Sequence, residues 1–345
     1  MSVPVQKNTT KDEILQRVQK VFTSEKSLSE FGAFEKIDWL PGDASNRFYG
    51  RVHLEKKTLM LMVMNAPEAF KSEEITGALN SKVKELPFVS IGRILEKENV
   101  RVPHIYYVAS DAEFLLSEDL GDELLYLRRQ KEGATGWYER ALDELAKVQK
   151  IDRAITPHRF TLELLTWEAE HFVEYAILKR GKKVSDSALK EIRACCARLV
   201  EKMVNADYVL VHRDFHSKNL LILDDEKKIG VIDFQDALMG PPTYDLASLL
   251  RDSYVRLEDH EEENLIRYFE TISKQKVDRE LYFMTSLQRN LKAVGRFYYI
   301  LMVKGRDTHI PFVRPSLQRI FKTLKQLKEL KTLALLEGLF REEAG

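Results

Sequence analysis

The sequence predicts an α+β protein with a small N-terminal lobe built on an antiparallel sheet and a mainly helical C-terminal lobe. Up to about residue 120, short apolar runs are separated by charged or Gly-containing turns, which is typical of strands joined by hairpins. From about residue 123, apolar residues recur at helical spacing. The exception is residues 208–236, where two short apolar runs flank a charged turn. Because 345 residues suffice for about two domains, we expect lobes at 1–120 and 121–345.

Composition argues against several classes of partner. Lys+Arg and Asp+Glu both number 54, so we expect no nucleic-acid-binding surface. The only cysteines, Cys195 and Cys196, are adjacent, and adjacent cysteines rarely bridge each other, which fits a reducing compartment. The N-terminus lacks an apolar signal core, and apolar runs such as Leu59–Met64 are far shorter than the roughly 20 residues that span a bilayer. We expect a cytoplasmic monomer without membrane partners.

The predicted N-terminal lobe starts with an amphipathic helix and continues mainly as strands. Apolar residues at helical spacing mark the helix: Ile14, Leu15, Val18, Val21 and Phe22. Strands are expected around residues 34–39, 48–53, 58–64, 103–109 and 113–116, with helical segments at about 72–85 and 87–97. The first two strands form a hairpin whose tip is PGDASNR, residues 41–47. The last strand runs into a polar, Gly-containing segment at 117–122.

Helices of the C-terminal lobe are expected where apolar side chains recur at i, i+3 and i+4, namely at residues 137–151, 162–177, 188–204, 245–251, 264–272, 279–303 and 315–340. The last of these carries cations at three-residue steps: Arg319, Lys322, Lys325, Lys328 and Lys331. Such a stripe is typical of the solvated face of a packed helix. A basic helix that binds a membrane or a partner is the alternative.

Residues 208–236, YVLVHRDFHSKNLLILDDEKKIGVIDFQD, predict strand–turn–strand, because their apolar runs are too short for a buried helix. Asp214 and Asn219 precede the first strand of this hairpin, and Asp233 follows the second. The hairpin therefore brings three oxygen-bearing side chains to one end. The spacing H-R-D-x-x-x-x-N, followed by a strand-borne D-F, is the catalytic-loop pattern of kinases.

This chemistry assigns a role to each of the three side chains. We expect Asp214 to accept or orient the proton of an acceptor hydroxyl, and Asn219 and Asp233 to bind Mg²⁺ on the phosphates of ATP. In isolation, any such aspartate is more often a helix cap or a loop carboxylate. His212 and His216 have no third ligand at zinc spacing, so we interpret His212 as bracing the loop and His216 as lying near the site.

Two segments of the N-terminal lobe are candidates for contacts with ATP. The backbone amides and Ser45 of the hairpin tip would cover the phosphates, with candidate residues Gly42, Asp43, Ala44, Ser45, Asn46 and Arg47. A plain hairpin turn is the alternative. The strand that ends at Glu118, Asp119 and Leu120 would present backbone groups to the adenine edge, as a hinge between lobes does. An ordinary strand-to-helix loop explains it equally well.

Several polar residues lie on otherwise apolar helices of the C-terminal lobe. Thr243 or Asp245 is positioned to cap the helix that begins there, or Asp245 reaches back to order the catalytic loop. The candidates for acceptor contacts are Arg251, Gln288, Arg289 and Lys292, and near the loop His216 and Gln235. Hydrogen bonding between helices is the alternative for the four helical residues.

The motifs HRDFHSKN, IDFQDA and GPPTYDLASLLRD resemble the aminoglycoside phosphotransferase/choline kinase superfamily, small-molecule relatives of protein kinases. There, a second histidine follows the catalytic aspartate by two residues, as His216 follows Asp214. Five segments, from LPGDASNRFYGRV to SLQRNLKAVGRF over about residues 40–300, are more similar to bacterial sugar kinases of cell-wall recycling. Those kinases phosphorylate N-acetylmuramate and N-acetylglucosamine at the anomeric hydroxyl. The resemblance implies a protein-kinase-like fold, ATP and Mg²⁺ as cofactors, and an amino sugar as the small-molecule substrate.

The chain departs from the protein-kinase pattern at two places. The strand TLMLMVMNAPE has no lysine where protein kinases pair one with the α- and β-phosphates, and Asp233-Phe234 is followed by Gln235 instead of Gly. Arg47, Lys71 or backbone amides would then meet the phosphate charge. The missing lysine leaves open a nucleotide-binding scaffold without catalysis, and another acceptor (aminoglycoside, choline or homoserine) is a further alternative. The short path from Gly240 to Tyr244-Asp245 argues against a protein kinase, since no A-P-E segment intervenes.

Overall fold

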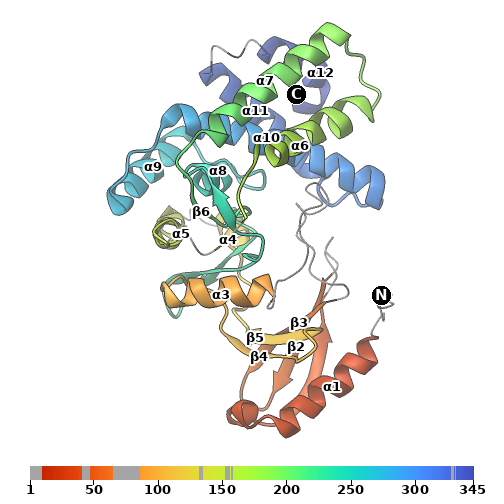
Figure 1. Cartoon of the computed structure of the whole chain (residues 1–345), viewed down its shortest axis with the longest axis vertical. Coiled ribbons are helices and arrows are strands. Elements are labelled where there is room, and N and C mark those ends of the chain that lie inside the picture. The colour runs from red at the N-terminus through yellow and green to blue at the C-terminus, as the bar shows by residue number, and fades with distance from the viewer. Residues whose placement is uncertain are drawn as a thin grey trace. The chain divides into compact units, whose positions relative to one another are not determined.

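The computed structural model describes residues 10–40, 47–64, 86–131, 135–151, 156, 158–327, 330 and 332–345. The chain divides into two compact units (Figure 1). One unit comprises Met1–Lys97 with Arg101–Asp122, and we call it the N-terminal unit. The other comprises Glu98–Val100 with Glu123–Gly345, and we call it the C-terminal unit.

A five-stranded antiparallel sheet forms the centre of the N-terminal unit, in the order β1-β2-β3-β5-β4. Its strands are β1 (Phe34–Trp39), β2 (Arg47–Leu54), β3 (Thr58–Met64), β4 (Ile105–Val108) and β5 (Phe114–Glu118). The predicted antiparallel sheet is therefore confirmed. The tip of the β1–β2 hairpin, residues 41–46, lies outside the described residues, as does the predicted helix at 72–85.

Helix α1 (Lys11–Ser24) packs its apolar residues against this sheet, and Figure 1 shows it lying alongside the strands. It starts at a capping box, in which Thr10 and Glu13 each accept a hydrogen bond from the other's backbone amide. Its buried residues, Ile14, Val18 and Val21, follow the predicted spacing. The 3₁₀ turn η1 (Lys26–Phe31) and helix α3 (Pro87–Lys97) complete the elements described in this unit.

The C-terminal unit is mainly helical, as the spacing predicts. Its helices are α4 (Leu125–Lys131), α5 (Thr135–Val148), α6 (Leu162–His171), the π-helical η3 (Phe172–Leu178), α7 (Asp186–Val204), α8 (Tyr244–Leu250), α9 (Asp259–Ser273), α10 (Arg279–Lys304), the 3₁₀ turn η4 (Ile310–Phe312), α11 (Val313–Gln326) and α12 (Leu333–Ala344). Two short antiparallel sheets interrupt them. Strand β6 (Val209–Val211) pairs with β9 (Leu238–Gly240), and β7 (Leu220–Leu223) pairs with β8 (Lys228–Val231).

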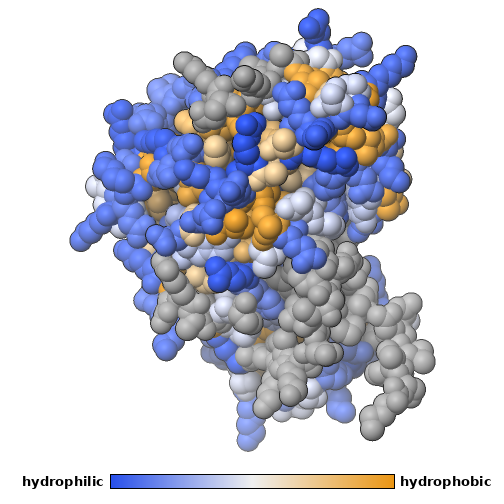
Figure 2. Space-filling view, turned by 45° about the horizontal axis from the view of Figure 1, so that its top comes forward, coloured by the Kyte–Doolittle hydropathy of each residue, from blue (hydrophilic) through white to orange (hydrophobic). Residues whose placement is uncertain are grey.

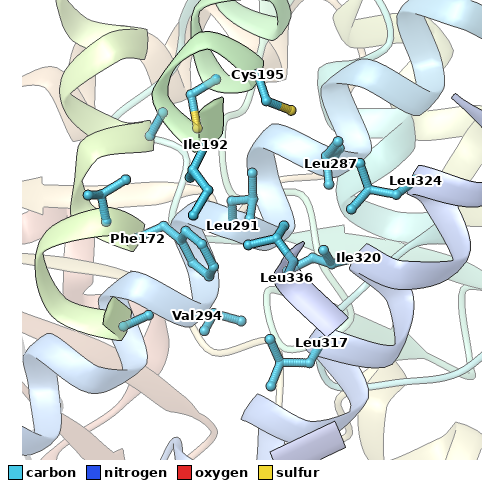
Figure 3. Close-up of a cluster of buried hydrophobic side chains, with 14 of the residues drawn as sticks. Phe172, Ile192, Cys195, Leu287, Leu291, Val294, Leu317, Ile320, Leu324 and Leu336 are labelled. Carbon is cyan, nitrogen blue, oxygen red and sulfur yellow. The ribbon is translucent and has the colours of Figure 1, made fainter. Parts of the chain in front are cut away.

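An apolar core of this unit lies between α6–η3, α7, α10, α11 and α12, whose side chains point toward one another in Figure 3. Both cysteines are buried in it as free thiols. Helix α10 crosses η3 at Gly295, where an added Cβ would come 2.5 Å from the carbonyl carbon of His171. Because no side chain fits that gap, glycine sets how closely α10 can approach this segment.

The single helix predicted at residues 315–340 is wrong, since the chain leaves the helix after Gln326 and α12 begins at Leu333. Leu327 and Leu330, between the two helices, are buried in the same core. The predicted solvated stripe also fails at Arg319, which is 7% exposed and lies 3.7 Å from the Glu262 carboxylate. Periodicity alone does not reveal that a buried carboxylate from α9 would draw this cation inward.

The face seen in Figure 2 is predominantly hydrophilic, with hydrophobic side chains gathered in limited patches among charged ones. Among the helices that the structure describes, none combines the length and the apolarity needed to cross a membrane.

Candidate active site

The loop between β6 and β7 carries Asp214 and Asn219, and the segment after β8 carries Asp233. The Asn219 side-chain amide donates to the Asp214 carbonyl at 2.9 Å and lies 3.4 Å from the Asp233 carboxylate. The Ile232 N–H donates to the Asn219 carbonyl at 3.1 Å, which ties the two segments together. The Asn219 and Asp233 side chains, expected to meet at one end of the hairpin, therefore lie side by side, and the Asp214 backbone is hydrogen-bonded to Asn219.

Two residues of this loop region adopt left-handed backbone conformations, Arg213 at φ 79° and Asp233 at φ 64°. Residues other than glycine enter this region at a cost, and such outliers cluster at functional sites. At Arg213 the cost is offset by Asp245, whose two carboxylate oxygens accept hydrogen bonds from the His212 N–H at 2.6 Å and the Arg213 N–H at 3.0 Å. Asp245 thus reaches back to order the loop, the second of its two predicted roles. Its helix, α8, has no side-chain cap.

Burial raises the pKa of Asp245 to about 7, while the two amide hydrogen bonds and the charge of Arg289 act in the opposite direction. Asp245 is fully buried, and the loop groups that bind its carboxylate are two backbone N–H groups. Their dipoles compensate less for the lost hydration than a cation does.

His212 braces the loop, as expected. Its Nε2 lies 2.9 Å from the Ile232 carbonyl and its Nδ1 lies 3.3 Å from the Asp214 N–H. Burial lowers the pKa of His212 to about 4, despite the nearby Asp214. The imidazole is therefore neutral at pH 7, with the proton on Nε2 donated to the carbonyl and Nδ1 accepting from the amide.

Behind Asp214 lies a cluster of buried charges that we call the Glu168 cluster, formed by Glu168, Arg213, Gln288 and Lys292. Glu168, on α6, pairs with Arg213 at 2.8 Å and with Lys292 at 2.9 Å, and Gln288 donates to it at 3.3 Å. Burial by itself raises the pKa of Glu168, but the charges of Lys292 and Arg213 dominate and lower it to about 2. The cluster therefore contains one carboxylate and two cations, so it carries a net positive charge.

Arg289 extends this positive charge to the loop. It donates to the Arg213 carbonyl at 2.9 Å, and its guanidinium lies 4.5 Å from the centre of the Tyr244 ring. Burial opposes ionisation of Asp214, yet Lys292, His216, Arg289 and Arg213 together hold the pKa of Asp214 far below its ordinary value. Asp214 is therefore a permanent carboxylate, suited to orienting a hydroxyl and receiving its proton late.

The predicted acceptor contacts are not all in one place. Gln288, Arg289 and Lys292 lie in or beside the Glu168 cluster. Arg251 does not: its three guanidinium nitrogens bind Glu262 at 2.7 Å, Thr323 at 2.7 Å and Gln326 at 3.0 Å, and it is 3% exposed. The assignment of Arg251 to the acceptor is wrong, because its hydrogen bonds link α8 to α9 and α11, as the interhelical alternative states.

His216 and Gln235 lie on the two segments that carry Asp214 and Asp233. Gln235 donates to the Asp233 carboxylate at 2.7 Å, and the His216 ring packs edge-on against Tyr254. The Gln235 side-chain oxygen and the His216 Nδ1 are buried and find no hydrogen-bond partner among the described residues. Unpaired polar atoms are costly, so these two atoms are candidates to bind a ligand.

The predicted nucleotide-binding residues of the N-terminal unit fall into two groups. Gly42 to Asn46, and the alternative phosphate partner Lys71, lie outside the described residues, and Arg47 begins β2. At the end of β5, the Glu118 N–H donates to the His104 carbonyl at 2.8 Å, so it is not available to a base, contrary to expectation. The Asp119 carboxylate binds Arg51 and Thr58, both at 2.7 Å. Leu120 is buried.

Some residues around the loop were not anticipated from the sequence. For Glu168 the sequence contains one indication of a buried role, a carboxylate on the apolar face of α6, among Leu164, Leu165 and Ala169. For Lys218 the sequence contains none. Its ammonium lies over three aromatic rings contributed by distant parts of the unit: Tyr126, Tyr254 and Phe312.

Among solved structures, a choline/ethanolamine kinase family protein from Mesorhizobium loti superposes with a TM-score of 0.62 at 13% identity, over 94% of this chain and 99% of that one. An ADP-bound aminoglycoside phosphotransferase, APH(2'')-Ib, gives 0.58 at 15% identity, over 93% and 98%. These similarities show that the fold is protein-kinase-like.

Curated relatives share more sequence. The N-acetylmuramate/N-acetylglucosamine kinase of Neisseria meningitidis serogroup B is 28% identical over 277 residues, 76% of this chain and 82% of the relative. The kinase of the same name from Pseudomonas aeruginosa is 30% identical over 236 residues, 65% and 69%. The model of the phosphotransferase enzyme family matches residues 38–280, which include the whole loop region described above. The chain therefore belongs to the phosphotransferase enzyme family and is a kinase.

Proposed function

We propose that this kinase transfers the γ-phosphoryl group of ATP to the anomeric hydroxyl of N-acetylmuramate, N-acetylglucosamine or both. The observation that carries the chemistry is the meeting of Asp214, Asn219 and Asp233 at one end of the β7–β8 hairpin. The amino-sugar acceptor is supported by the names of the curated relatives. The proposed setting is cell-wall recycling by a cytoplasmic monomer.

Asp214 is the proposed catalytic residue. Its carboxylate orients the acceptor hydroxyl, whose oxygen forms a bond to the γ-phosphorus while the bond between that phosphorus and the β,γ-bridging oxygen breaks. ADP leaves with that electron pair, and the hydroxyl proton passes to Asp214. An anomeric hydroxyl is somewhat more acidic than an ordinary alcohol. The depressed pKa of Asp214 therefore suits it to positioning and late proton transfer.

The residues at the end of the hairpin fit a magnesium site. Asp233 offers a carboxylate and Asn219 an amide oxygen, the hard ligands that Mg²⁺ prefers. No cluster of three or more His, Cys, Asp or Glu side chains forms a metal site in the described part of the chain. This suits an ion that takes its remaining ligands from phosphates and water. Mg²⁺ bound there would neutralise charge on the transferred group.

Substrate contacts are proposed for the two unpartnered atoms beside the site, the Gln235 side-chain oxygen and the His216 Nδ1. Both are suited to hydrogen-bond hydroxyl or amide groups of a sugar. Gln288, Arg289 and Lys292 are instead proposed as positioning residues, because they bind Glu168, the Arg213 carbonyl and Tyr244. Backbone groups of Asp119 and Leu120 remain the proposed contacts with adenine.

The test is an ADP-release assay with N-acetylmuramate, N-acetylglucosamine, choline, homoserine and an aminoglycoside, followed by a reducing-end assay on the sugar products. We expect ADP release with the amino sugars and loss of the reducing end, because a phosphate on the anomeric oxygen blocks ring opening. Turnover that leaves the reducing end intact would show that another hydroxyl is phosphorylated. Nucleotide binding without ADP release for any acceptor would favour the non-catalytic scaffold, for which the missing lysine in β3 is the motivating observation.

A further inference from the structure

Lys218 lies on the catalytic loop, between Ser217 and the proposed magnesium ligand Asn219. Its ammonium is 4.0 Å from the centre of the Tyr254 ring, 4.3 Å from Phe312 and 5.0 Å from Tyr126. We call these three rings the aromatic box. They also contact one another: Tyr254 and Phe312 are 4.8 Å apart, and Tyr126 is 6.4 Å from each.

The aromatic box is anchored to the loop by hydrogen bonds. The Asp252 carboxylate accepts from the Ser217 N–H at 2.9 Å and from the Tyr254 N–H at 2.8 Å. The Tyr126 N–H donates to the Ser217 carbonyl at 3.0 Å. Hydrogen bonds thus tie Tyr126 and Tyr254 to Ser217, the residue before Lys218. The His216 ring also packs edge-on against the Tyr254 ring, with 5.1 Å between the ring centres. The box therefore has a set position relative to Asp214, four residues earlier.

A group of three aromatic rings is a site for a cation, since ring faces attract positive charge by about 0.5–2 kcal/mol per contact, depending on solvation. Here the cation is supplied by the chain itself. A second cation entering the box would have to displace the Lys218 ammonium and be repelled by it. Lys218 is partly exposed, and Tyr254 contacts both its ammonium and the ring of His216, a proposed substrate contact, so the positive charge lies beside the proposed acceptor site.

We propose that Lys218, held in the aromatic box, selects acceptors by charge: it excludes cationic acceptors and binds the carboxylate of an anionic one. This rests on the proposed function in one respect, that the acceptors are amino sugars. Of the two sugars, N-acetylmuramate carries a lactyl carboxylate and N-acetylglucosamine does not. Lys218 is therefore a specificity-determining residue for N-acetylmuramate.

The first experiment compares kcat/KM for the two sugars in four proteins: wild type, Lys218→Met, Lys218→Arg and, as a matched control, Lys190→Met. Lys190 is exposed on α7. The ratio of kcat/KM for N-acetylmuramate to that for N-acetylglucosamine should fall at least about tenfold in Lys218→Met, because a charge-assisted hydrogen bond to one substrate is lost. It should stay within about threefold of wild type in Lys218→Arg and unchanged in Lys190→Met.

Two outcomes would overturn the inference while leaving the proposed function standing. One is an equal loss for both sugars in Lys218→Met, which indicates a structural role. The other is a wild-type enzyme that phosphorylates N-acetylglucosamine but not N-acetylmuramate. If the wild-type enzyme phosphorylates neither sugar, the proposed function fails, and a binding experiment decides the inference.

That experiment titrates tetramethylammonium into the full-length protein by calorimetry. Wild type should show no binding, whereas Lys218→Ala, whose box lacks its own cation, should bind in the millimolar range. Adding Tyr254→Leu to Lys218→Ala should abolish that binding. Equal binding by wild type and Lys218→Ala, or no binding by a Lys218→Ala protein that melts within a few degrees of wild type, would overturn the proposal.

Discussion

The regions around Asp214 and Asp245 adjoin one loop and shift the pKa values of their two carboxylates in opposite directions. Lys292, His216, Arg289 and Arg213 hold the pKa of Asp214 far below its ordinary value. Asp245 receives two backbone amides and is fully buried, and its pKa is raised to about 7. An aspartate side chain thus serves as a permanent anion at Asp214 and as an acceptor for backbone amides at Asp245.

The difference shows that cations, and not burial, decide the charge state here. Burial raises the pKa of both carboxylates. At Asp214 the charges of Lys292, His216, Arg289 and Arg213 overcome it, whereas at Asp245 the charge of Arg289 and two amide hydrogen bonds do not. Glu168 itself follows the same rule, with a pKa lowered to about 2 by Lys292 and Arg213. Two carboxylates with different environments can therefore take different roles at one site.

The largest expected effect is on Asp214. Replacing Asp214 by Asn removes the carboxylate but keeps the size and polarity of the side chain. We expect kcat to fall by at least about 10²-fold, because general-base and orienting effects are worth about 10²–10⁴. Steady-state ADP release measures this, and circular dichroism checks that the fold is retained. Turnover near the wild-type level would refute the assignment of Asp214.

The next largest effect is expected for Glu168→Gln, which should lower the free energy of unfolding. The substitution leaves Arg213 and Lys292 buried without their carboxylate, and a pKa lowered from 4.5 to about 2 corresponds to about 3 kcal/mol of unfolding free energy at pH 7. Urea unfolding measures it. A matched control is Glu263→Gln, since Glu263 on α9 forms partly exposed ion pairs with Arg267 and with Arg279 of α10, and it should cost less than about 1 kcal/mol.

The pH dependence of that cost has a definite sign. A carboxylate with a depressed pKa contributes stability above its unfolded value, near 4.5, and loses that contribution as the pH falls toward 2. The difference in unfolding free energy between wild type and Glu168→Gln should therefore shrink as the pH falls from about 5 toward 2. A difference that does not change with pH would contradict the ion pairing.

Asp245→Asn should have the smallest effect of the three, about 1–3 kcal/mol of unfolding free energy, because an amide keeps one acceptor oxygen for the two loop N–H groups. Loosening the left-handed conformation of Arg213 should also lower kcat. Since the pKa of Asp245 is raised to about 7, its stabilising contribution is greatest at low pH and is lost as the pH rises through 7. The cost of Asp245→Asn should therefore be greater at pH 5 than at pH 8, opposite in trend to Glu168→Gln. The same cost at both pH values would contradict the raised pKa.

Local features of the fold were largely predictable. The strands of the N-terminal sheet, the apolar face of α1 and the β7–β8 hairpin follow from patterns within about 30 residues. The break after Gln326 was not predictable, because apolar spacing continues through 327–332 while Leu327 and Leu330 pack into a core shared with distant helices.

By itself, the sequence determined that Asp214, Asn219 and Asp233 would meet, since a short hairpin leaves little freedom in where its ends lie. It also determined the family, because those residues and their spacing form the motif. Only the tertiary structure decided what surrounds them. Glu168, Asp245 and Arg289 lie at least 32 residues along the chain from the loop residues that they bind, so these contacts depend on how α6, α8 and α10 pack. The Lys218 box depends on packing in the same way, because its three rings come from three separate segments. The charge states of these residues, and with them the proposed acceptor selection, therefore depend on the packing, since the electrostatic environment of a residue is set by neighbours in space.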